Sequence, residues 1–366
     1  MKTGKFYLLV SYSVDIARRQ AGCEKTMKVK WFLFLLTILF FLLLVLSFSD
    51  FYKKEDQTKK VGVLLMGDSR EEKYQGLRDG LTDAGFQQNQ LMYVVKNAHD
   101  QSTVLESSIK KLLAENPDVI VTLGAMETIE LKSELSKKDI NIPVVFAGMA
   151  DPIDFGVIKD YSSSSTNFTG INNYHTSMSA KRLELLQELV PNLKRVHIIY
   201  DKTIEASIRG LNETKKAAKI LNITLIPWDV NNQKYKMKMK EVKQESDAIM
   251  TLSSFRLESQ TKEIAELSRE TQMPVMGISK HEVELGFLAS YGTSFYEQGK
   301  QSARFVSAIL QGNSPTRLPV ELPDNIRLMV NKRVAEQLNI RLNQETLHIA
   351  EYVHSVQSSL EGEKSR

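Results

Sequence analysis

The stretch VGVLLMGDSREEKYQGLRDGLTDAGF (61–86) has the pattern of a buried strand followed by an amphipathic helix. Residues 61–67 form a short apolar run with β-branched members that ends in glycine, which predicts a strand covered on both faces of a parallel sheet. Tyr74, Leu77 and Leu81 then recur at helical spacing. The stretch therefore predicts one strand–helix unit, with the glycine after Ala84 as the helix stop.

After this unit, strands and helices continue to alternate, and a second series of the same kind begins at about residue 195. Further strands are expected at 91–95, 118–124, 142–148, 195–201, 223–230, 247–253 and 273–279. Helices are expected at 71–84, 102–116, 127–135, 207–221, 235–246 and 258–271, with Ser102 or Thr103 as a cap. Two such series predict an α/β protein with two doubly wound, parallel-sheet lobes. Ligands of such sheets bind beyond the carboxyl ends of the strands.

The N-terminus carries the positive charge of the chain. Residues 1–60 hold 11 Lys and Arg against 5 Asp and Glu, out of 48 and 44 in all, so the remainder is slightly negative. A basic patch for nucleic acid is therefore not expected on the globular part.

An apolar run, WFLFLLTILFFLLLVLSF (31–48), follows Lys25, Lys28 and Lys30. It predicts a transmembrane anchor or signal peptide over 31–49, after a basic cytoplasmic segment 1–30 and before a linker 50–60. Met27 is an alternative start, which would leave 1–26 untranslated. We expect the remaining chain on the extracytoplasmic side of the cell membrane, or secreted or periplasmic if the signal is cleaved.

Catalytic and metal motifs are missing from the sequence. The single cysteine, Cys23, allows neither an intrachain disulfide nor a thiolate metal site. The six histidines are scattered, and the sequence contains no GxSxG, Walker A or HExxH motif. We therefore expect no enzyme, no cofactor and no metal site.

An ordered set of motifs resembles the ABC-transporter substrate-binding family of the type I periplasmic-binding-protein fold, the tryptophan/tyrosine type in particular. These motifs are GLRDGLTDAGF (76–86), NPDVIVTLG (116–124), IPVVFAGMADPID (142–154), NFTGI (167–171), LELLQELVPNLKRVHIIYD (183–201), DAIMTLSSF (247–255), GFLASYGTSFYEQGKQSARFVSAILQGNSP (286–315) and LPVELPDNIRLMVNKRVAEQLNI (318–340). The loop Gly67-Asp68-Ser69-Arg70 departs from the pattern, which leaves the ligand open.

The resemblance implies two lobes joined by a three-stranded hinge. Crossovers are expected near 168–173, 290–294 and 319–323. Lobe 1 would comprise 60–170 and 294–320, lobe 2 would comprise 171–293 and 321–350, and 351–366 would form a polar tail.

In lobe 1, the candidate ligand-binding residues follow the expected strands. Asp68 and Ser69 could bind a ligand or cap the next helix. The small residues of the segment Gly124, Ala125, Met126 and Glu127 could expose helix N–H groups to an anion or serve close packing. Ala150 and Asp151 could bind an amine or brace a turn.

In lobe 2, Tyr200, Asp201, Ser253, Ser254, Phe255 and Arg256 occupy the equivalent positions, with Ser279 and Tyr291 near the second crossover. An arginine can hold a carboxylate with two hydrogen bonds, and an aromatic ring can stack on a ligand ring. Arg256 could equally lie on a solvated helix face.

This mixture of charges, hydroxyls and rings suits an amino acid better than a sugar phosphate or a metal. The resemblance implies delivery of an aromatic or branched amino acid to an ABC transporter permease. The alternatives are a sensor domain, a sugar-responsive repressor or an enzyme. A sensor usually needs a cytoplasmic output domain or a second span, a repressor needs a helix-turn-helix headpiece, and an enzyme needs a catalytic motif.

Overall fold

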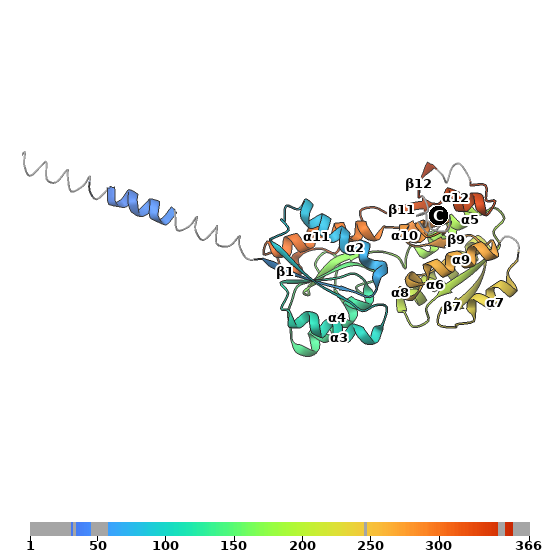
Figure 1. The fold of residues 1–366 in the computed structure, drawn as a ribbon, viewed down its shortest axis with the longest axis horizontal. Helices are drawn as coiled ribbons and strands as arrows, with labels where there is room; N and C mark the ends of the chain where they lie inside the picture. Colours follow the sequence, from blue (N-terminus) through green and yellow to red (C-terminus); the bar gives the residue numbers. More distant parts are fainter. Residues whose placement is uncertain (1–30, 32–33, 45–57, 245–246, 343–347, 354–366) are drawn as a thin grey trace, which may run out of the picture. The chain divides into compact units, whose positions relative to one another are not determined.

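The computed structural model describes residues 31, 34–44, 58–244, 247–342 and 348–353 (Figure 1). The chain divides into two compact units, 1–58 and 59–366. Residues 34–44 of the first unit are helical. Among the described residues, no helix is both long and apolar enough to cross a membrane. Cys23, the segment 1–30, most of the linker and the tail beyond residue 353 lie outside the described residues.

The second unit begins with a five-stranded parallel sheet, the core of lobe 1. Its strands are β1 (Lys59–Leu65), β2 (Leu91–Asn97), β3 (Val119–Thr122), β4 (Val144–Met149) and β5 (Phe168–Asn172), in the order β2-β1-β3-β4-β5. Side chains alternate along β1, so Val61 and Val63 pack on one face and Leu64 on the other. The predicted doubly wound lobe is confirmed.

Helices cover both faces of this sheet. The helices are α2 (Glu71–Asp83) and α11 (Phe295–Leu310) on one face and α3 (Ser102–Ala114) and α4 (Ala125–Lys138) on the other, with short 3₁₀ turns η1 (Asp68–Arg70) and η2 (Pro315–Arg317). Gly85 has φ of +93° and ends α2 as predicted. Ser102 is the first residue of α3 rather than its cap, because the cap position falls on Gln101.

Lobe 2 repeats this strand order and extends it. Its seven strands are β6 (Arg195–Tyr200), β7 (Thr224–Asp229), β8 (Asp247–Thr251), β9 (Val275–Gly277), β10 (Ala289–Gly292), β11 (Arg327–Val330) and β12 (Ala350–Tyr352), in the order β12-β11-β10-β9-β8-β6-β7. The expectation of an all-parallel sheet is wrong at one pair, since β10 and β11 are antiparallel. The chain leaves lobe 2 after β10, forms α11 in lobe 1, and returns in the opposite direction as β11.

The helices of lobe 2 are α5 (Ser179–Leu189), α6 (Glu205–Leu221), α7 (Tyr235–Val242), α8 (Phe255–Ser259), α9 (Thr261–Thr271), α10 (Lys280–Glu284) and α12 (Lys332–Gln337). The helix expected over 258–271 begins earlier and is interrupted at Gln260, which separates α8 from α9. This break lets α8 stand at the carboxyl end of β8.

Hydrogen bonds tie the segments that pass between the two sheets. The buried Arg182 of α5 donates from Nε to Tyr291 O (2.7 Å) and from Nη1 to His175 O (2.8 Å), and so joins the first crossover to the second. The amide of Asn172 donates to Glu321 O (2.9 Å), which joins the first to the third. The crossovers thus form one connected hinge.

Helices α2 and α11, far apart in sequence, lie side by side in lobe 1 (Figure 1). Glycines make this approach possible. A Cβ on Gly76 would lie 2.0 Å from Tyr296 O, and a Cβ on Gly299 would lie 1.9 Å from Lys73 O. Because backbone atoms are the obstacles, no side-chain rotation could relieve the clash.

We expect Gly76→Ala to destabilise the protein by about 1–3 kcal/mol, although alanine normally stabilises a helix relative to glycine. Gly210→Ala in α6 is the matched control, because its nearest neighbour would be the Ser179 hydroxyl at 3.1 Å. Thermal unfolding should show a clearly lower midpoint for Gly76→Ala only. A Gly76→Ala protein as stable as wild type would contradict the packing.

Candidate functional site

A cavity lies between the lobes, at the carboxyl ends of both sheets. Lobe 1 contributes the ends of β3 and β4 and the starts of α2, α4 and α11, while lobe 2 contributes the loops after β6 and β8. The lining residues are Arg70, Lys73, Gly124, Ala125, Met126, Gly148, Met149, Ala150, Asn173, His175, Ile204, Ala206, Ser253, Ser254, Phe255, Glu258 and Phe295. The cavity therefore occupies the position at which doubly wound sheets bind ligands.

Arg70 lies at the centre of the charges in this cavity. Its buried guanidinium contacts Glu127 of lobe 1 (Nη1 to Oε1, 3.1 Å) and Glu258 of lobe 2 (Nε to Oε2, 3.2 Å), and it also donates to Leu123 O. Burial alone would lower the pKa of Arg70, but the two carboxylates reverse the effect and raise it. One cation thus links the two lobes.

The sequence around Arg70 accommodates this side chain. A Cβ on Gly124, the N-cap of α4, would lie 1.2 Å from Arg70 Nη1, so any other residue there would displace the guanidinium. Glu127, fully buried in the first turn of α4, accepts a 2.7 Å hydrogen bond from the Met66 amide as well as those from Arg70. Glu127 therefore holds the guanidinium in place from the protein interior and does not line the cavity.

Lys73 brings a second buried cation to the cavity. Its Nζ donates to Leu123 O (2.9 Å) and Ala147 O (3.0 Å), at the ends of β3 and β4, and lies 4.9 Å from the centre of the Phe295 ring. Burial, reinforced by the charge of Arg70, lowers the pKa of Lys73 to about 7. An ammonium has three donors, so one remains after the two carbonyl bonds.

His175, in the first crossover, supplies an uncharged polar group. It is 2% exposed, and its Nε2 has no hydrogen-bond partner within the described part of the chain. Burial and the nearby cations Arg182, Lys73 and Arg70 hold the pKa of His175 well below its usual value. A neutral imidazole with a free nitrogen thus lines the cavity.

Seven of the residues predicted as ligand-binding line the cavity: Gly124, Ala125, Met126, Ala150, Ser253, Ser254 and Phe255. The remaining ones lie elsewhere. In lobe 1, Asp68 accepts from Asn97 Nδ2 at 2.6 Å, and Ser69 Oγ is buried. Neither caps α2, whose N-cap is Arg70. Asp151 lies in the turn after β4 with φ of +50°, and its backbone carbonyl, not its carboxylate, accepts from the Phe155 amide.

In lobe 2, Arg256 and Asp201 bind each other instead of lining the cavity. Arg256 Nη1 lies 2.7 Å from Asp201 Oδ2, and Ser254 Oγ also donates to that oxygen. Burial would raise the pKa of Asp201, but donors from Thr203, Asn231 and Arg256 outweigh it and lower the pKa to about 2. This carboxylate therefore braces the loop that carries Ser253 and Phe255.

The other three predicted residues of lobe 2 have packing or capping roles. Tyr200 and Tyr291 pack against the lobe 2 core, and Ser279 forms a capping box with Glu282 at the start of α10. None of the three is part of the cavity lining.

Sequence reasoning missed the charged residues Arg70, Lys73 and Glu258. In the sequence, Arg70 and Lys73 resemble solvent-exposed residues at the start of the helix expected from residue 71. Glu258 resembles a solvent-exposed residue of the helix expected over 258–271. One signal was available for Lys73, since it shares a helical face with the buried Gly76, Leu77 and Gly80. Its position on that face indicates burial.

Comparison with known proteins gives consistent matches. The family described as ABC transporter substrate binding protein matches residues 60–354. A tyrosine-binding protein of Clostridioides difficile (strain R20291) is 20% identical over 299 residues, which cover 80% of this chain and 85% of the relative.

Solved structures agree with this match. A conserved domain protein from Vibrio cholerae has a TM-score of 0.73 and 26% sequence identity. The match covers 81% of this chain and 99% of the Vibrio cholerae chain. An ABC domain in complex with L-Trp from Streptococcus pneumonia also has a TM-score of 0.73, at 23% identity, covering 81% and 100%. Because the family match spans both lobes and the hinge, the chain belongs to the ABC transporter substrate-binding proteins.

Proposed function

We propose that the cavity binds an α-amino acid with an aromatic or branched side chain, which the protein delivers to an ABC transporter permease. The observation that carries this proposal is a set of charges of both signs in one cavity, the buried Arg70 and Lys73 from lobe 1 and the largely buried side chain of Glu258 from lobe 2. Buried charges require partners, and a zwitterion offers one of each sign. The names of the tyrosine-binding relative and the L-Trp complex support the same class.

Each end of a zwitterion has a counterpart in the cavity. We assign the ligand carboxylate to the remaining donor of Lys73 and to Arg70, and the ligand ammonium to Glu258. Phe255 and Phe295 supply apolar surface for the side chain, and the free Nε2 of His175 supplies a polar contact. Arg256, which the sequence suggested for the carboxylate, is already committed to Asp201.

A neutral sugar fits these charges less well. Solved sugar-binding proteins share the fold, including one with bound myo-inositol (TM-score 0.52, 14% identity). A polyol would leave the buried cations and Glu258 to compensate only one another, whereas an amino acid adds a partner for each. The ligand class therefore follows from the charges rather than from the fold.

The N-terminal segment fits attachment to the membrane. The uncharged run 31–48 directly follows three lysines, which favours a cytoplasmic N-terminus and an extracytoplasmic binding unit. We propose that this run is an uncleaved anchor that keeps the binding unit beside its permease.

Attachment can be tested with fusions to full-length protein. A reporter that is active only after export, fused after Arg366, should be active and should remain in the membrane fraction. A cytoplasm-only reporter at the same position serves as the control. Activity of that second reporter would contradict the topology, and release of the exported fusion into the soluble fraction would contradict anchoring.

Glu258→Gln tests the assignment of the ammonium. Removing one partner of a buried charge pair costs about 2–5 kcal/mol, so affinity for L-tyrosine or L-tryptophan should fall at least tenfold in calorimetry of the purified full chain. Glu266→Gln, on an exposed position of α9, makes the same chemical change and should leave affinity unaltered. Equal affinities of Glu258→Gln and wild type would remove Glu258 from the site.

Lys73 predicts a pH dependence of binding. A ligand carboxylate beside Nζ raises the pKa of Lys73 above its ligand-free value of about 7, so binding takes up a proton. Affinity should be constant below pH 7 and should fall as the pH rises above it. Calorimetry in buffers of different ionisation enthalpy measures the uptake, and Lys73→Met should abolish it. Wild-type binding without proton uptake between pH 7 and 8.5 would contradict the contact.

A further inference from the structure

A second groove crosses the lobe boundary outside the amino-acid cavity. Helix α2 of lobe 1 and helix α10 of lobe 2 form part of its walls. Five glutamates line this groove, against only two basic side chains, Lys280 and Arg327. Such an excess of negative charge favours a cation.

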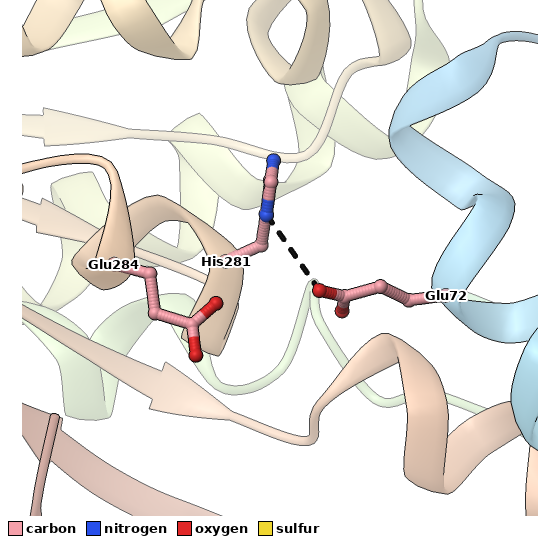
Figure 2. A group of neighbouring side chains, drawn as sticks. All are labelled: Glu72, His281 and Glu284. Atoms are coloured by element: carbon pink, nitrogen blue, oxygen red, sulfur yellow. Dashed lines mark ion pairs between the residues drawn. The ribbon is translucent and has the colours of Figure 1, made fainter. Parts of the chain in front are cut away.

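Three side chains converge in this region (Figure 2). Glu72 comes from α2, whereas His281 and Glu284 lie three residues apart on α10 and so share one helical face. One ligand atom of each residue lies within 4.8 Å of those of the other two. His281 Nδ1 and Glu72 Oε1 are 3.7 Å apart.

These distances suit a metal ion. Zinc binds imidazole nitrogen and carboxylate oxygen at about 2.0–2.2 Å, which places two tetrahedral ligands about 3.4 Å apart. The Glu72–His281 separation is close to that value, and a ligand atom of Glu284 lies within 4.8 Å of both. An imidazole ligand favours zinc, copper or nickel over calcium or magnesium.

Glu284 also has a basic neighbour. Lys280 Nζ lies 3.2 Å from Glu284 Oε1. A carboxylate has two oxygens, so Glu284 can keep Lys280 on one and offer the other to a metal.

We propose that Glu72, His281 and Glu284 bind a divalent transition-metal ion of the zinc type, and that this ion favours the closed arrangement of the lobes. The ligands come from both lobes, so they meet only when the lobes are close. A metal that prefers this state must raise affinity for any second ligand that also prefers it. This coupling, unlike the metal site itself, rests on the proposed amino-acid function.

The metal site is tested without amino acid. Tag-free full chain is titrated with Zn²⁺ by calorimetry, together with Glu72→Gln and His281→Asn. The control Glu71→Gln removes a neighbouring carboxylate of the same groove and helix. Wild type should bind one ion, the two triad variants at least tenfold more weakly, and the control within threefold of wild type. Thermal unfolding checks that each variant is folded. No zinc uptake, or equal uptake by all folded variants, would overturn the site.

The coupling is tested by adding Zn²⁺ to the calorimetry with L-tyrosine or L-tryptophan. Zinc should increase amino-acid affinity at least threefold in wild type and leave Glu72→Gln unchanged. A zinc-independent affinity would overturn the link to closure. If no amino acid binds, the proposed function is refuted but the metal site is not, because the zinc titration is carried out without amino acid.

Discussion

The buried guanidinium of Arg70 is the interaction on which the binding region depends. A desolvated cation needs anionic partners, and Arg70 has one in each lobe, Glu127 and Glu258. This requirement accounts for the glycine at 124, which leaves room for the guanidinium, and for the buried Glu127 in the first turn of α4. The charge of Arg70 also adds to the burial that lowers the pKa of Lys73. The same guanidinium thus has its charge compensated within lobe 1 and makes the contact with lobe 2.

This arrangement has a consequence for closure. Glu258 contacts Arg70 directly and so provides a charged contact between the lobes. A bound amino acid that disturbs the Arg70–Glu258 ion pair must therefore interact more favourably with these two residues than they do with each other. It can do so because it supplies both a carboxylate and an ammonium. Glu72 of α2 also lies 3.7 Å from His281 of α10, on another part of the lobe boundary. Two contacts on different parts of the lobe boundary thus favour the same state, while the hydrogen-bonded crossovers hold the hinge.

The fold could be predicted from the sequence because it depends on periodic burial. Alternating residues of β1 face opposite helix layers, and strands such as VIVT (119–122) are buried on both faces. The antiparallel direction of β11 could not be predicted from burial patterns, because it depends on the path of the chain, which passes through lobe 1 between β10 and β11. The site was predicted in its small, hydroxyl and apolar residues but not in its charged ones. Arg70, Lys73 and Glu258 resemble solvated surface residues in sequence, and their burial results from contact between elements far apart in the chain. Arg256 had the right chemistry, but Asp201 of the same lobe takes up its charge.

In the proposed function, a zwitterion binds between Glu258 of lobe 2 and the cations Lys73 and Arg70 of lobe 1. The most direct test is a crystal structure of the protein with L-tyrosine or L-tryptophan. We expect the ligand carboxylate within hydrogen-bonding distance of Lys73 Nζ or the Arg70 guanidinium, and the ammonium on a carboxylate oxygen of Glu258. A ligand bound in the reverse orientation, or outside this cavity, would contradict this assignment.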